Sequence, residues 1–167
     1  MNPRERGFRR RDERGEGNML KTHYRDYATE AYRLHARLGS AAAYKRRIYV
    51  EAQQRQAQGG SGVGSPTEAA VLRGEAAVAQ KESVWRDLEA VERAIERIAS
   101  RRNGDCILRA VREVYQVHSE TPLERGEIAD RVIQLSMEMP ASPRSIYGWL
   151  SLARDVFAEE RGLRMKE

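Results

Sequence analysis

Apolar side chains recur along most of this chain at alternating spacings of three and four residues, the period of an amphipathic α-helix. The first such stripe consists of Leu20, Tyr24, Tyr27, Ala31, Leu34 and Leu38. Gly39 suits a left-handed helix stop, and Ser40 can cap a second helix that runs to about Ala57. Residues 19–58 therefore predict an N-terminal helical hairpin.

The next predicted helix is long. Glycine and serine dominate residues 59–65, which predict a linker. Ser65-Pro66-Thr67-Glu68 then has the composition of a helix N-terminus, and a single helix is predicted over 66–103. Within it, residues 84–98 carry an apolar stripe formed by Val84, Leu88, Val91, Ile95 and Ile98. The stripe fits two partners equally, a second copy in a coiled-coil homodimer or other helices of the same chain.

The last third of the chain has the pattern of a helix-turn-helix. An amphipathic helix over 107–118 supports two more, predicted over 121–136 and 142–157 and separated by a short break at 137–141. On the final helix the apolar positions recur at spacings of four, three and four, at Ile146, Leu150, Ala153 and Phe157. Residues 104–167 are therefore predicted to form a DNA-binding domain.

The face of the final helix opposite its apolar stripe is the predicted DNA-reading surface. Arg144 can bind guanine through two hydrogen bonds, and Ser145 and Ser151 can contact bases or phosphates. Gly148 costs a helix about 1 kcal/mol relative to alanine, which indicates close approach of a DNA backbone or a neighbouring helix. Free amides at the start of this helix suit an anion. The predicted DNA-binding residues are Ser142, Arg144, Ser145, Tyr147, Gly148, Ser151 and Arg154. The alternative is a helical pair that only closes a bundle, with Arg144 solvated.

Composition favours an all-α protein with an anionic partner. Hydrophobic residues make up 40% and charged residues 33% of the 167 residues, and no two-residue alternation predicts a sheet. The net charge is +5, yet residues 1–58 alone carry +7 (14 basic, seven acidic) and residues 121–167 carry −1 (seven basic, eight acidic). The basic excess thus lies outside the predicted DNA-reading module. We expect residues 1–18 to be a disordered basic tail, either a DNA-binding arm or a solvated start.

The sequence predicts neither catalysis nor a membrane anchor. No apolar run approaches the roughly 18 residues that span a bilayer. The single cysteine, Cys106, fits a reducing cytoplasm and has no Cys or His at metal-ligand spacing. His23, His35 and His118 are scattered, and no nucleophile or phosphate-loop motif occurs. We therefore expect a cytoplasmic protein that is not an enzyme and has no cofactor and no metal site.

Two segments, residues 24–39 and 144–163, resemble the ArpU-type phage and prophage transcriptional regulators, whose helix-turn-helix is similar to region four of bacterial sigma factors. The resemblance implies a regulator of late phage genes that binds double-stranded DNA. It also implies that the reading positions are Arg144, Ser145, Tyr147 and Ser151. The alternatives are a phage DNA-packaging component, such as a small terminase subunit, and a helical adaptor bound to RNA polymerase.

Overall fold

The computed structural model describes residues 25–55 and 66–163, and all regular secondary structure in these ranges is helical. The helices are residues 25–38, α2 (Ala41–Gln54), α3 (Pro66–Gln80), α4 (Glu82–Ala99), α5 (Gly104–Val111), the π-helix η1 (Arg112–Gln116), α6 (Glu127–Glu138) and α7 (Pro143–Glu160). The predicted all-α fold is confirmed. The predicted tail over 1–18 and the predicted linker over 59–65 lie outside the described residues.

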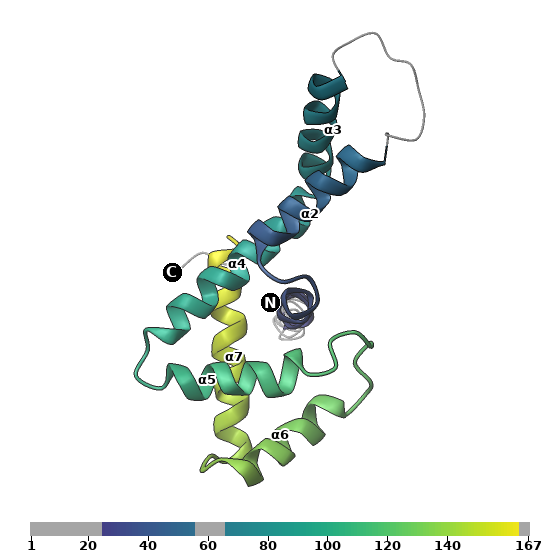
Figure 1. The fold of residues 1–167 in the computed structure, drawn as a ribbon. Coiled ribbons are helices and arrows are strands. Elements are labelled where there is room, and N and C mark those ends of the chain that lie inside the picture. The colour runs from purple at the N-terminus through teal and green to yellow at the C-terminus, as the bar shows by residue number, and fades with distance from the viewer. Residues whose placement is uncertain (1–24, 56–65, 164–167) are drawn as a thin grey trace, which may run out of the picture.

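The helices form an arm and a bundle (Figure 1). α2 and α3 lie side by side and project away from the other helices as the arm. In the bundle, residues 25–38 are seen nearly end on, and α5 lies across α7. One core joins Tyr32 of the first helix to Val91 of α4, Tyr115 of η1 and Phe157 of α7. α2 pairs with α3, and residues 25–38 share a core with the C-terminal helices, while Leu34 and Leu38 also pack against Ala41 and Tyr44 at the start of α2.

Aromatic side chains fix residues 25–38 to α7. The ring of Tyr32 lies 6.2 Å from that of Tyr115 and 6.1 Å from that of Phe157, measured between centroids. Its hydroxyl donates a 2.9 Å hydrogen bond to the carbonyl of Ala153. Burial raises the pKa of Tyr32, so this hydroxyl keeps its proton and acts as the donor. The bond also satisfies a polar group that would be costly to bury alone.

The apolar stripe over 84–98 packs inside the chain. Leu88, Val91 and Ile98 are fully buried, and Val91 and Ile98 belong to the core shared with residues 25–38 and α7. Leu88 packs with Ala41 and Tyr44 at the base of the arm. The structure shows that the stripe packs against other helices of the same chain, which is one of the two predicted partners. Val84 and Ile95 of the same stripe are only partly buried, and a homodimer through residues 84–98 stays a prediction.

The helix predicted over 66–103 is two helices. Lys81 separates α3 from α4, with φ of −102° and ψ of 19°. The carbonyl of Val78 accepts bonds from the Lys81 amide and the Trp85 indole nitrogen, both at 3.1 Å. Trp85 thus satisfies the backbone where the helix breaks. The break lets α3 pair with α2 in the arm while α4 enters the bundle.

Local capping confirms three predicted helix ends. Gly39 adopts a left-handed conformation with φ of +78°. The hydroxyls of Ser40 and Ser142 each accept a 3.2 Å bond from the amide three residues later. α3 also begins at Pro66, as predicted. These ends depend on side chains next to the helix itself.

The segment before α6 departs from the prediction. The helix expected over 107–118 becomes α5 and η1 and ends at Gln116, and the helix expected from residue 121 begins only at Glu127. Gly126 precedes it with φ of +91°, and the Glu127 carboxylate accepts a 2.8 Å bond from the Glu124 amide. This bond lowers the pKa of Glu127, with a smaller contribution from Arg131.

Buried Arg33 explains why residues 117–126 form a loop. Its guanidinium donates to the carbonyls of Tyr115 at 3.1 Å, His118 at 3.2 Å and Ser119 at 3.4 Å, and also to that of Thr121. Carbonyls that point into one guanidinium cannot also follow the ladder of an α-helix. A residue of the first helix therefore sets the shape of the loop that leads into α6.

Candidate nucleic-acid interface

α6 and the N-terminal half of α7 meet at one end of the bundle, joined by residues 139–142 (Figure 1). Each helix buries one face in the common core. α6 contributes Val132 and Leu135, and α7 contributes Ile146, Leu150 and Ala153. α5 also packs on α7. The first turns of α7 are therefore held firmly by their buried side while their other side faces outward.

Most of the predicted DNA-binding residues lie on that outward side. Ser142, Arg144, Ser145, Tyr147 and Gly148 are exposed, and Ser151 is half-buried. Residues 144, 148 and 151 follow one another at helical spacings of four and three, so the structure brings them onto one face. In the described part of the chain, no hydrogen bond or ion pair holds the Arg144 side chain. Its guanidinium is therefore available to an external acceptor.

The surface around Gly148 is open. A Cβ atom built on Gly148 would meet nothing within 4 Å. A neighbouring helix of the described chain therefore does not require glycine at this position. Close approach of a DNA backbone, the other explanation that the sequence offered for Gly148, is compatible with this open surface and stays a prediction.

The amide of Ser145 is not free, contrary to the sequence-based prediction of an anion site. It donates a 3.2 Å bond to the hydroxyl of Ser142, and the two serine hydroxyls lie 2.9 Å apart. The helix N-terminus thus caps itself. An incoming phosphate would have to displace the Ser142 hydroxyl to reach the Ser145 amide.

The Arg154 side chain connects α7 to η1. Its guanidinium donates a 2.7 Å hydrogen bond to the Tyr115 hydroxyl and is half-buried. Burial raises the pKa of Tyr115, and Arg154 partly offsets that rise. The structure therefore separates Arg154 from the open face that begins at Arg144.

Sequence reasoning missed the side chains that position α6. Arg131 donates a 2.8 Å bond to the Val114 carbonyl of η1 and also pairs with Glu127. At the other end of α6, Arg109 of α5 lies 3.5 Å from Glu138. These arginines are one turn or many residues away from their partners, and the apolar period that predicts helices contains no signal for such contacts.

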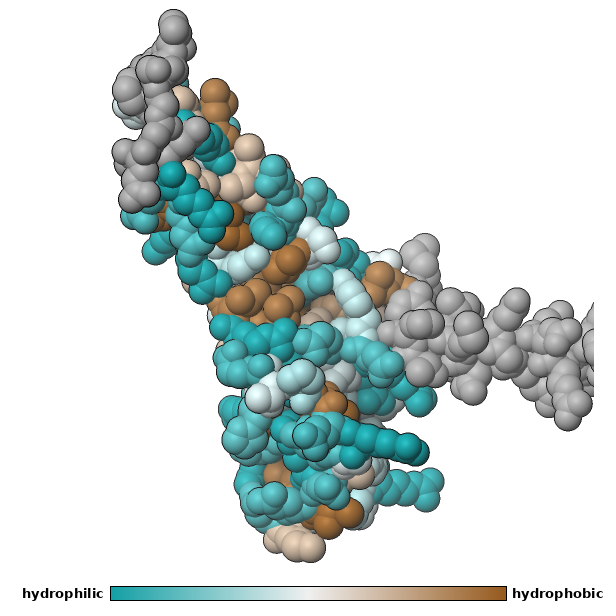
Figure 2. Space-filling view, turned by 90° about the vertical axis from the view of Figure 1, so that its right-hand side faces the viewer, coloured by the Kyte–Doolittle hydropathy of each residue, from teal (hydrophilic) through white to brown (hydrophobic). Residues whose placement is uncertain are grey.

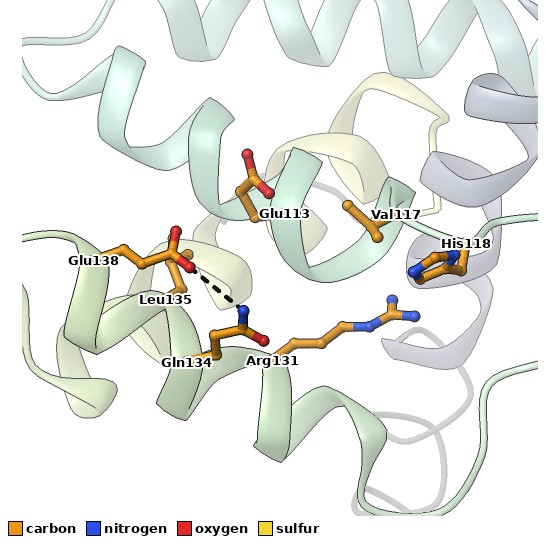
Figure 3. Close-up of a pocket in the computed structure, with 7 residues that line it drawn as sticks. All are labelled: Glu113, Val117, His118, Arg131, Gln134, Leu135 and Glu138. Carbon is orange, nitrogen blue, oxygen red and sulfur yellow. Dashed lines mark hydrogen bonds between the residues drawn. The ribbon is translucent and has the colours of Figure 1, made fainter.

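A small polar cavity lies between η1 and α6 (Figure 3). Its volume is about 210 Å³, and Arg131 extends into it toward His118 while Gln134 donates to Glu138 at 3.4 Å. Ligand pockets usually measure roughly 300–1,000 Å³. The cavity is therefore too small to argue for a small-molecule site.

The described residues show neither a metal-binding cluster nor a membrane-spanning helix. No three His, Cys, Asp or Glu side chains in residues 25–55 and 66–163 gather where they could hold a metal ion. Over the same ranges, no helix combines the length and apolar character needed to cross a bilayer. Comparison with known proteins finds no matching family model, curated protein or solved structure. The geometry of α6 and α7 therefore carries the functional argument.

Proposed function

We propose that this chain is a non-catalytic, sequence-specific DNA-binding protein that inserts the first turns of α7 into the major groove of double-stranded DNA. The observation that supports it is the open face from Arg144 to Ser151, held at the end of a rigid bundle. The major groove, about 12 Å wide, admits an α-helix. Arg144 would read guanine, and the serines would contact bases or phosphates.

The composition of this face favours DNA binding over a solvated bundle surface. Its residues are small except for Arg144 and Tyr147, and Gly148 and the serines lower the helix propensity. A surface that only faces water gains nothing from that loss. A surface that must bring its backbone close to a DNA strand does gain, because small side chains shorten the approach.

The resemblance to ArpU-type regulators extends the proposal to transcriptional control of late phage or prophage genes. In that role the protein acts in the cytoplasm, where the DNA lies, and RNA polymerase is a second partner. A closed ring of many copies in solution would instead favour the DNA-packaging alternative. A monomer or dimer that retards promoter DNA favours regulation.

Selection of bound duplexes from random DNA at physiological salt tests the proposal directly, followed by Arg144→Ala on the selected site. The substitution is expected to weaken specific binding by about 1–3 kcal/mol and to relax the preference at one base position. Arg101→Ala, at an exposed arginine between α4 and α5, is the matched control and should leave the affinity unchanged. Failure to enrich any duplex would contradict the proposal, and equal loss on all sequences would assign Arg144 to phosphate.

Gly148→Ala separates stability from binding. We expect it to stabilise the protein by about 1 kcal/mol, because the added methyl group meets nothing and alanine favours the helix. We also expect weaker DNA binding, because that methyl group occupies the surface that a DNA strand approaches. Urea denaturation and DNA titration of one preparation measure both effects. Ser83→Ala on the exposed face of α4 should stabilise without weakening binding; unchanged affinity in Gly148→Ala would argue against close approach there.

A further inference from the structure

The outer side of the arm carries a surface that DNA binding does not use. Along α3 and into α4, acidic and apolar residues alternate at spacings of three and four: Glu68, Val71, Glu75, Val78, Glu82 and Trp85. This spacing places them on one side of the helical path. We name this set, together with Leu72, the acidic stripe.

Two apolar members of the acidic stripe, Val71 and Leu72, gain little burial within their own chain, while Val78 and Trp85 are half-buried. Leu72 is 65% and Val71 is 37% exposed, and of residues 67–80 only Gly74 is buried. Two open grooves flank them, one lined by residues 67, 68, 71 and 72 and the other running from Tyr49 to Trp85. Figure 2 shows apolar side chains exposed among hydrophilic ones along the arm. An apolar surface of this kind marks an interaction site.

The same arm carries the complementary surface. On α2, Arg46, Arg47 and Val50 lie within one turn of each other and are all exposed; we name this set the basic face. Val50 is 39% exposed, with the two arginines one turn before it. In the described part of the chain, no ion pair joins Glu68 or Glu75, or Arg46 or Arg47, to another residue. The two surfaces therefore carry charges of opposite sign beside exposed apolar side chains, although Glu82 of the acidic stripe already pairs with Arg86 of its own chain.

We propose that a second copy of this chain docks on the arm, with the basic face of each copy on the acidic stripe of the other. A two-fold arrangement satisfies both surfaces at once, because each copy offers both halves of the contact. The product is a four-helix bundle of two α2–α3 pairs. Its surface overlaps residues 84–98 only at Trp85 and is separate from the open face of α7. Such a dimer presents two α7 helices, which suits an operator of two half-sites.

Two charge-reversal variants of the full chain test this contact. Glu68→Lys with Glu75→Lys makes both surfaces basic, and Arg46→Glu with Arg47→Glu makes both acidic. Sedimentation equilibrium is expected to give a dimer for the unchanged protein and a monomer for each variant, because like charges then face each other. An equimolar mixture of the two variants is expected to regain the dimer mass, because both halves of the mixed contact are complementary.

Matched controls keep the result specific. Asp105→Lys with Glu120→Lys makes the same change of charge at exposed positions outside the arm and should leave the dimer intact. Circular dichroism confirms that each variant keeps its helices. A monomeric unchanged protein at submillimolar concentration would overturn the proposal, as would a mixture that stays monomeric. Deletion of residues 1–18 should leave the dimer intact, and loss of the dimer would overturn the proposal by assigning the acidic stripe to that basic segment.

Discussion

Phe157→Ala is expected to lower the free energy of unfolding by about 3–5 kcal/mol. Phe157 is fully buried, and its ring centroid lies 5.9 Å from that of Tyr27 and 6.1 Å from that of Tyr32. Truncation opens a cavity between residues 25–38 and α7, in a core that relaxes only partly to fill it. Urea denaturation followed by helical circular dichroism measures the change.

Tyr147→Ala is the matched control, since it truncates an aromatic side chain on the same helix. Tyr147 is 44% exposed, so its removal should change the free energy of unfolding by less than about 0.5 kcal/mol. Equal effects of the two substitutions would contradict the packing of residues 25–38 against α7. In the structure the C-terminal helices share their core with residues 25–38, and they do not form a module with a core of their own.

Arg33→Met is expected to cost about 3 kcal/mol of stability. The Arg33 side chain is 1% exposed, and its guanidinium holds the carbonyls of Tyr115, His118 and Ser119. Methionine fills much of the same space but donates no hydrogen bond. The Tyr115 carbonyl then loses its donor, while the carbonyls of His118 and Ser119 keep only their bonds from Thr121 and Arg37. Each buried group left unsatisfied costs about 1–3 kcal/mol. Denaturation measures the loss, and faster hydrogen exchange in residues 117–126 shows where it acts.

Arg37→Met is the matched control for Arg33→Met, because Arg37 donates to the same loop from a more exposed position. Arg37 also donates to the Ser119 carbonyl, at 2.8 Å, but its side chain is 25% exposed and pairs with exposed Glu30. Water can replace both contacts, so the expected cost is below about 1 kcal/mol. If both substitutions cost the same, Arg33 is not the residue that holds the loop.

The helix ends that the sequence predicted are those set by neighbouring residues. Gly39 ends a helix because it adopts positive φ readily, and Ser40 and Ser142 begin helices because their hydroxyls reach an amide three residues later. The outward face of α7 also follows from local periodicity. Arg144 and Gly148 were predicted to share an open face because they are one turn apart.

The features that the sequence did not predict depend on contacts between distant residues. The break at Lys81 contains neither glycine nor proline, and a tryptophan side chain satisfies the carbonyl that the break leaves. The late start of α6 depends on Arg33, which lies 82–88 residues before the carbonyls that it binds. Arg154 was expected at the DNA surface, and only the position of Tyr115 shows that it turns inward. Apolar periodicity records which side of a helix is buried and not which helix buries it.

The hydrogen bond from Tyr32 to Ala153 connects residues 121 positions apart. During translation, residues 25–38 leave the ribosome early, and α7 leaves it much later. The core therefore cannot close until α7 has been synthesised, and the apolar side of the first helix stays uncovered until then. Contacts of such long range slow folding, because the intervening chain must be ordered before they form. We therefore expect the core between residues 25–38 and α7 to form late in folding, after the chain between them is ordered.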